Sequence, residues 1–140
     1  MTIKEYTATN ENKIAAEKWF SDLRDMICKK FEQIENSNSN KNSFKITNWD
    51  RDGGGGGKMS IMKGDIFEKV GVNISTVHGK FTEDFRSKIP GAEKDGNFWA
   101  SGISVVSHPK NPFVPAAHMN TRLIVTSKTW FGGGGDITPM

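Results

Sequence analysis

The sequence has few of the features that mark a membrane, secreted or disulfide-stabilised protein. Its 140 residues include one cysteine, Cys28, so no internal disulfide can form, which agrees with a reducing compartment. No apolar run approaches the roughly 20 residues needed to span a bilayer. Residues 1–13 contain no apolar core and no arginine, so they resemble neither a secretory signal nor a mitochondrial transit peptide. We therefore expect a cytoplasmic protein without a membrane span.

Charge and cysteine chemistry exclude further classes of function. The net charge of +3 is modest, and no basic stripe is interleaved with aromatic residues, so we do not expect nucleic-acid binding. Cys28 falls in an amphipathic helical segment, where a partly buried small hydrophobe is a simpler interpretation than a nucleophile. The chain length is sufficient for one compact domain with its own core.

The spacing of apolar residues predicts one long helix near the N-terminus. Asn10 to Ile34 carries a stripe with steps of three and four residues, and Thr9 or Asn10 is a suitable N-cap. Residues 36–40 form a polar loop with no evident reason to pack. The predicted stripe consists of Trp19, Phe20, Leu23, Met26, Ile27, Phe31 and Ile34.

After this loop the period changes to two, which predicts strands. Phe44 to Trp49 alternates, and further strands are expected around Met59–Ile61 and within 66–77. The two clearest strands are 98–108 and 118–127, joined by the proline-rich loop 109–117, whereas 81–96 is charged and irregular. One helix followed by serial strands with short connections predicts an antiparallel sheet with a helix packed on one face.

Nine of the 15 glycines lie in two runs, Gly53 to Gly57 and Gly132 to Gly135. The first run satisfies a phosphate-loop pattern only trivially, because Met59 follows Lys58 where Ser or Thr would hold magnesium. A bulge or wide turn that only glycine permits is one interpretation. A large flat ligand lying against bare backbone is the other, and both can hold.

Polar side chains alternate on the two clearest strands, which makes 104–122 the candidate site. Ser104 and His108 share one strand face, and His118, Asn120 and Arg122 share another. Three alternating polar side chains on a hydrophobic strand destabilise it if they are buried without partners. They therefore face water or line a polar cavity.

Two histidines and one aspartate allow a catalytic or a metal-binding interpretation. His108 and His118 are separated by a loop and match no compact zinc spacing. Asp136 follows the second glycine run, where a carboxylate often stabilises a turn.

Four segments, taken together, resemble the oxygen-dependent coproporphyrinogen III oxidases. The long block through His108 and His118 is the most specific, and the resemblance covers roughly the last two-thirds of the chain in the family's order. The segments are WDRDGGGGGK at 49–58, VGVNISTVHG at 70–79, SGISVVSHPKNPFVPAAHMNTR at 101–122 and WFGGGGDITP at 130–139.

The resemblance implies an enzyme of haem and porphyrin biosynthesis. The family's reaction is the oxidative decarboxylation of two propionates of coproporphyrinogen III to vinyls, which gives protoporphyrinogen IX. It consumes dioxygen and releases carbon dioxide and hydrogen peroxide. The resemblance further implies a homodimer and no organic cofactor, while a divalent metal has been proposed for some members and is disputed.

The resemblance also implies residues that bind the substrate. Ser104 falls on a position in substrate contact, and Asn120, Thr121 and Arg122 fall on the substrate-binding triplet. Because the substrate carries four propionates, Arg122 is suited to hold one through a charge-assisted bidentate pair.

Three further residues match catalytic or metal-binding positions of the family. His118 falls on the proposed proton donor, and His108 and His118 fall on proposed metal ligands. Asp136 matches the aspartate thought to engage the pyrrole N–H groups. A histidine suits proton transfer near neutral pH, and a carboxylate is a natural acceptor for converging N–H groups.

The expected fold class is α+β, an antiparallel sheet flanked by helices and incomplete because the chain is truncated. Family chains continue past the motif in which this sequence ends. We expect the N-terminal part of a single domain, with the helix and polar loop at 1–40 and the strands and site motifs at 41–140. Such a fragment is expected to be inactive alone. The alternative is a non-catalytic half-domain that binds a tetrapyrrole or another anion.

Overall fold

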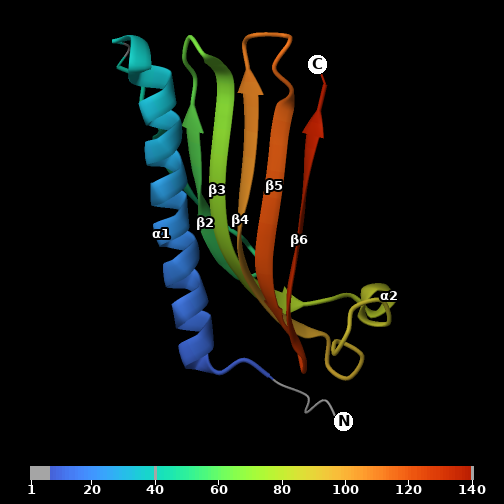
Figure 1. Cartoon of the computed structure of the whole chain (residues 1–140). Coiled ribbons are helices and arrows are strands. Elements are labelled where there is room, and N and C mark those ends of the chain that lie inside the picture. The colour runs from blue at the N-terminus through green and yellow to red at the C-terminus, as the bar shows by residue number, and fades with distance from the viewer. Residues whose placement is uncertain (1–6, 40, 140) are drawn as a thin grey trace, which may run out of the picture.

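The fold is α+β, as predicted, with one long helix packed on an antiparallel sheet (Figure 1). The computed structural model describes residues 7–39 and 41–139, so the N-terminal segment 1–6 and Asn40 of the predicted loop lie outside the described residues. Each strand pairs with its neighbours in sequence. The strands are β1 (Lys45–Asp50), β2 (Gly55–Met62), β3 (Phe67–Lys80), β4 (Asn97–Pro109), β5 (Ala116–Val125) and β6 (Thr129–Thr138).

Helix α1 (Asn10–Glu35) has nearly the predicted bounds because its N-terminus is capped locally. The Thr9 hydroxyl accepts a hydrogen bond from the backbone N–H of Asn12 at 3.2 Å, and the Asn12 side chain accepts one from the Thr9 N–H at 3.0 Å. This reciprocal capping box satisfies two backbone donors that have no partner within the helix. Beyond α1, residues 36–38 form a short 3-10 helix. The Asn36 side chain bonds to the backbone of Asn42, so the predicted loop is tied down at its start.

The predicted apolar stripe on α1 is only partly buried. Trp19, Met26 and Ile34 are 53%, 49% and 50% exposed and lie outside the buried line. That line contains two charged residues, Arg24 and Glu35, which are buried against the sheet. Periodicity missed Glu35 because its hydrogen-bond donors come from a distant part of the chain, whereas Arg24 is paired with its neighbour Asp25 on the same helix.

The carboxylate of Glu35 fixes the end of α1 against the turn between β2 and β3. Glu35 is fully buried, and its oxygens accept hydrogen bonds from the backbone N–H groups of Asp65, Ile66 and Phe67 at 2.6 to 3.1 Å. Burial alone would raise the pKa of this carboxyl, but the donated hydrogen bonds outweigh it and hold the pKa below its ordinary value. A Cβ at Gly64 would lie 2.1 Å from Glu35 Cδ, so the turn requires glycine there.

The sheet has two distinct faces, because successive side chains on a strand point in opposite directions. On β4, every second residue from Ser101 to Pro109 is buried, and these residues lie on the side that α1 covers. We call this side the α1 face and the other side the open face. The core on the α1 face includes Phe20, Met62, Phe67, Val70, Val72, Ile103, Val105, Leu123 and Val125.

Both glycine runs contribute to strands. Gly53 and Gly54 form the turn before β2, as predicted, but Gly55 to Gly57 lie inside β2 and Gly132 to Gly135 lie inside β6. Glycine has a low intrinsic preference for strands, so β6 was not evident from the sequence. Pairing with β5 along its whole length compensates for this.

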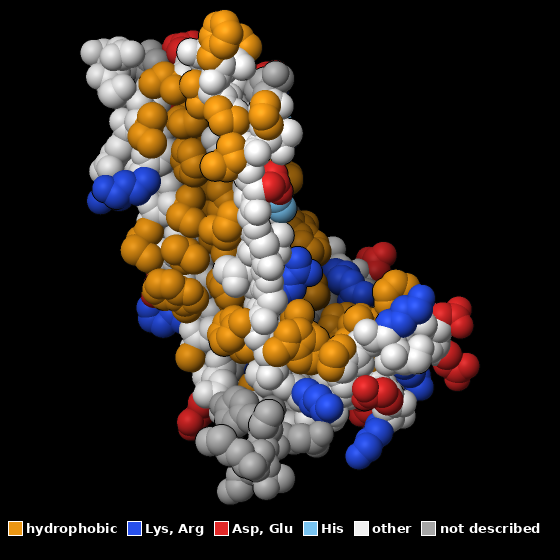
Figure 2. Space-filling model, turned by 45° about the vertical axis from the view of Figure 1, so that its right-hand side comes forward, with side chains coloured by type: hydrophobic (Ala, Val, Ile, Leu, Met, Phe, Trp, Pro, Cys, Tyr) orange, Lys and Arg blue, Asp and Glu red, His pale blue; other side chains and the backbone are white. Residues whose placement is uncertain are grey.

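Helix α1 packs over β3 and β4, so part of the α1 face near β6 remains uncovered. Figure 2 shows hydrophobic side chains gathered between α1 and β6. A groove of about 310 Å³ lies there, and its lining includes Trp19, Leu123 and Phe131.

The segment predicted to be irregular contains only the short helix α2 (Glu83–Arg86), which lies beyond the end of the sheet (Figure 1). No helix in the described part of the chain is both long and apolar enough to cross a membrane.

Candidate functional site

The open face is organised in rows of register partners that run across the strands from β1 to β6. The first row is Trp49, Gly57, Ser75, Gly102, Arg122 and Gly132. The second row is Thr47, Met59, Asn73, Ser104, Asn120 and Gly134. The third row is Lys45, Ile61, Gly71, Val106, His118 and Asp136. Residues predicted to form one site therefore occupy adjacent rows.

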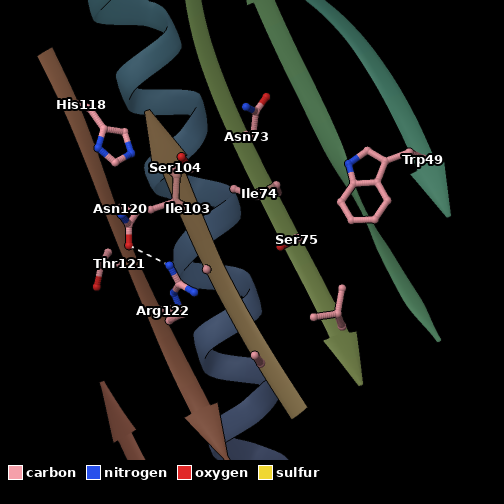
Figure 3. A pocket seen from close by; sticks show the side chains of 13 residues that line it. Trp49, Asn73, Ile74, Ser75, Ile103, Ser104, His118, Asn120, Thr121 and Arg122 are labelled. Carbon is pink, nitrogen blue, oxygen red and sulfur yellow. Dashed lines mark hydrogen bonds between the residues drawn. The ribbon is translucent and has the colours of Figure 1, made fainter. Parts of the chain in front are cut away.

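A cavity of about 420 Å³ lies on this face, within the range of roughly 300 to 1,000 Å³ typical of small-molecule sites. Figure 3 looks onto the open face, with α1 behind the sheet. Polar side chains from β3, β4 and β5 surround the cavity, and Trp49 stands at its far side. The lining residues are Trp49, Asn73, Ile74, Ser75, Val77, Ala100, Gly102, Ile103, Ser104, His118, Asn120, Thr121 and Arg122.

His118 and Asp136 form a hydrogen-bonded pair on the open face. They are direct register partners on β5 and β6, and His118 Nδ1 lies 3.1 Å from Asp136 Oδ2. An ionised carboxylate can only accept, so Nδ1 carries the proton in this pair. The ring is then held in one tautomer, with Nε2 as the nitrogen that can exchange a proton with a ligand. Both side chains are partly exposed, at 40% and 59%, so water and ligand can reach them.

Arg122 is oriented by its neighbour on the same strand face. Its Nη2 donates a hydrogen bond to Asn120 Oδ1 at 3.0 Å (Figure 3). Arg122 lines the cavity with its other guanidinium donors still able to bind an anion, because the guanidinium has five N–H groups in a planar fork. This geometry suits bidentate binding of a carboxylate.

Ser104 and Thr121 were both expected at the site, and the structure places their side chains on opposite faces. Ser104 lies beside Asn120 in the second row and lines the cavity. Thr121 is the register partner of Ile103, a core residue, so its side chain belongs to the α1 face. A role for Thr121 in ligand contact is therefore limited to its backbone.

His108 lies on the same face as His118 but outside the cavity lining. It is two residues beyond Val106, the register partner of His118. Among residues 7–39 and 41–139, no three side chains of the metal-ligating types His, Cys, Asp and Glu are grouped closely enough to hold an ion. A metal held by His108 and His118 stays a prediction.

Cys28 is placed as a structural residue. Its side chain is half-buried and packs against the core, as predicted. Burial raises the pKa of the Cys28 thiol to about 11, which leaves very little nucleophilic thiolate near neutral pH.

The cavity lining includes residues that were not predicted as site residues, and those with polar or aromatic side chains are Trp49, Asn73 and Ser75. The sequence contained a signal for two of them. Asn73 and Ser75 alternate with buried or partly buried apolar residues on β3, and the same alternation on β5 was used to predict the site. Trp49 carries no comparable signal, since its position beside the cavity depends on the register of β1 with β2.

The His118–Asp136 pair leads to a first testable expectation. In the Asp136→Ala variant, the imidazole of His118 should lose its fixed Nδ1–H tautomer and shift toward the Nε2–H form that free histidine prefers. Long-range ¹H–¹⁵N spectra of the neutral ring distinguish the two tautomers. Thr138→Ala is the control, because it removes a hydroxyl that donates to the other Asp136 oxygen and should leave the tautomer unchanged. An Nε2–H tautomer in the unaltered chain would contradict the assignment.

Comparisons with known proteins identify the family of this chain. Residues 15–140 match the family described as coproporphyrinogen III oxidase. An oxygen-dependent coproporphyrinogen-III oxidase from Rickettsia felis is 60% identical over 134 residues, which cover 92% of this chain and 48% of that protein. The proteins of the same name from Rickettsia akari and Rickettsia africae are 59% and 58% identical with the same coverage. The chain thus spans about half the length of these relatives. It belongs to the coproporphyrinogen III oxidase family.

Proposed function

We propose that this chain supplies a substrate-binding face of an oxygen-dependent coproporphyrinogen III oxidase. The observation that carries the proposal is the cavity on the open face, which is lined by the oriented Arg122 and by His118 in a chain of this family. Asp136 is not among the lining residues and adjoins the cavity through its hydrogen bond to His118. The reaction is the oxidative decarboxylation of two propionates of coproporphyrinogen III to vinyls, giving protoporphyrinogen IX in haem biosynthesis.

Arg122, Asn120 and Ser104 are proposed to bind the substrate. The guanidinium of Arg122 pairs with one propionate, and Asn120 holds the guanidinium in position. Ser104 lies next to Asn120 and offers a hydroxyl to a second polar group of the ligand. Thr121 contributes backbone groups only.

His118 and Asp136 are proposed to take part in proton transfer. For each vinyl, the propionate loses carbon dioxide and two electrons together with a proton, and dioxygen takes up two electrons and two protons to become hydrogen peroxide. His118 is the proton donor: its Nε2 takes up the proton that the propionate side chain loses and passes it to the reduced dioxygen, while Nδ1–H stays bonded to Asp136. The second proton of hydrogen peroxide comes from water. Asp136 also has a second oxygen on the open face that can accept a pyrrole N–H of the substrate.

The remaining assignments follow from the family and are part of the proposal. Dioxygen is the co-substrate and no organic cofactor is needed, and a divalent metal would be held by His108 and His118. The complete enzyme is a cytoplasmic homodimer, and this chain is the N-terminal part, with residues 1–140, of its single domain.

A second candidate is a non-catalytic half-domain that binds a tetrapyrrole or another anion. The oriented guanidinium of Arg122 favours it, because this group can bind an anion without any reaction. In this case Arg122 and the open face retain binding, and the substrate is held too loosely for the chemistry.

Turnover and binding, measured on the same chain, test both candidates. We expect coproporphyrin III to bind, but no protoporphyrin above a protein-free control after incubation with coproporphyrinogen III in air and subsequent oxidation. The relative from Rickettsia felis serves as the positive control. Turnover near the rate of that relative would show that the remaining half is dispensable. An absence of coproporphyrin binding would contradict the proposed substrate face.

A further inference from the structure

The first row of the open face has a distinctive composition, with an aromatic side chain and a cation separated only by small residues. Between Trp49 on β1 and Arg122 on β5 lie Gly57, Ser75 and Gly102. Neighbouring strands are about 4.8 Å apart, so the two Cα atoms are separated by about 19 Å along the row. The three small residues leave a flat trough floored mainly by backbone.

The indole of Trp49 leans into this trough. A Cβ on Gly57 would come 2.8 Å from Cζ2 and 2.9 Å from Cε2 of the indole, so the ring lies directly over the Gly57 Cα. A larger residue at position 57 would force the ring away from this position. The glycine therefore places the indole as a side wall of the trough.

Trp49 does not serve the core of the protein. Its register partner Gly57 is on the open face, whereas the core residues lie on the α1 face. The side chain is 39% exposed and lines the cavity opposite Arg122 (Figure 3). An indole that is partly exposed at the edge of a polar cavity provides a large apolar surface with little conformational freedom to lose, which suits contact with a flat ring.

We propose that Trp49 forms an aromatic subsite that packs against one pyrrole ring of a bound tetrapyrrole, while Arg122 pairs with a propionate on the opposite side. This inference rests on the proposed function. Ser75 and Gly102 form the floor under the macrocycle, and Gly57 makes room for the indole beside it. The distance between Trp49 and Arg122 selects a ligand wider than a single ring. Trp49 thus contributes to recognition of the macrocycle, and Arg122 to recognition of its carboxylates.

The two contributions can be separated with two probes. Coproporphyrin III has the macrocycle and four propionates, and butane-1,2,3,4-tetracarboxylate has four carboxylates without a ring. Calorimetry on the 140-residue chain should show coproporphyrin III binding about 5- to 10-fold more weakly to Trp49→Ala, the effect of losing one aromatic contact. Binding of the tetracarboxylate should not change. Trp49→Phe keeps an aromatic ring and should recover most of the affinity. It also keeps the test valid if the alanine variant fails to fold.

Trp19→Ala is the matched control, because Trp19 is an exposed tryptophan on α1, on the other side of the sheet. It should bind both probes like the unaltered chain. If Trp49→Ala and Trp49→Phe both bind coproporphyrin III as tightly as the unaltered chain, the aromatic subsite is refuted and the proposed function stands. If the tetracarboxylate is weakened as much as the porphyrin, Trp49 acts on the fold of the site and the inference is equally refuted. If the unaltered chain binds no coproporphyrin, the proposed function itself fails.

Discussion

Replacing Arg122 with alanine is expected to weaken the binding of coproporphyrin III by about 10- to 100-fold. The guanidinium is the cation that lines the cavity, and a hydrogen bond to a charged group contributes roughly 1.5 to 3 kcal/mol. Arg122→Lys should recover only part of this affinity, because an ammonium keeps the charge but not the planar fork. Calorimetric titration at two salt concentrations measures both effects, and the loss should be smaller at high salt.

Lys58→Ala is a suitable control for charge. Lys58 is a cation on β2, but its register partner is Ile74, so its side chain lies on the α1 face. Its removal lowers the net charge by the same amount as the loss of Arg122 and should leave affinity almost unchanged. Equal losses in the two variants would show that net charge, and not the guanidinium at the cavity, attracts the ligand.

Replacing Glu35 with glutamine is expected to destabilise the protein by about 2 to 4 kcal/mol at neutral pH, because a buried carboxylate that accepts backbone N–H groups is replaced by a neutral amide that satisfies them poorly. Urea unfolding followed by circular dichroism measures the difference. The matched control is Glu17→Gln, which alters an exposed carboxylate of the same helix and should change stability by less than about 0.5 kcal/mol.

The effect of Glu35→Gln should also depend on pH. The pKa of Glu35 is lowered in the folded protein, so its contribution to stability is complete above the unfolded pKa of about 4.3 and is lost as the pH falls through the folded value. The stability difference between the unaltered chain and the variant should therefore shrink below about pH 4. A difference that stays constant from pH 7 into this acidic range would contradict the role of the charged form.

Local signals predicted much of the fold. Thr9 marks the start of α1 because capping depends only on residues within one turn, and the alternation at 118–122 correctly placed His118, Asn120 and Arg122 on one face. What periodicity could not predict depends on contacts between distant residues. Glu35 is buried because donors about 30 residues later in the chain reach it.

The same distinction explains the outcome for the site. Strand β6 could not be predicted from the sequence, because its glycines have a low intrinsic preference for strands. Its conformation depends on pairing with β5. Trp49 is separated from Arg122 by most of the sheet, and only the register of five strands brings both to one row. Thr121 is the opposite case. It is adjacent in sequence to Asn120 and Arg122, but successive side chains of a strand point to opposite faces, so its side chain lies on the other face of the sheet.

The sequential order of the sheet has a consequence for how the chain folds. Because each strand pairs only with the strand before and after it, the sheet can grow by one strand at a time as the polypeptide leaves the ribosome. The helix is made before the strands, yet it packs on β3 and β4. Its apolar side can therefore be buried only after those strands have been synthesised. Glu35 can capture the turn at 65–67 before then. During synthesis, Glu32 can hold the start of β1 through the backbone N–H of Phe44, and Glu35 would then fasten α1 to the start of β3.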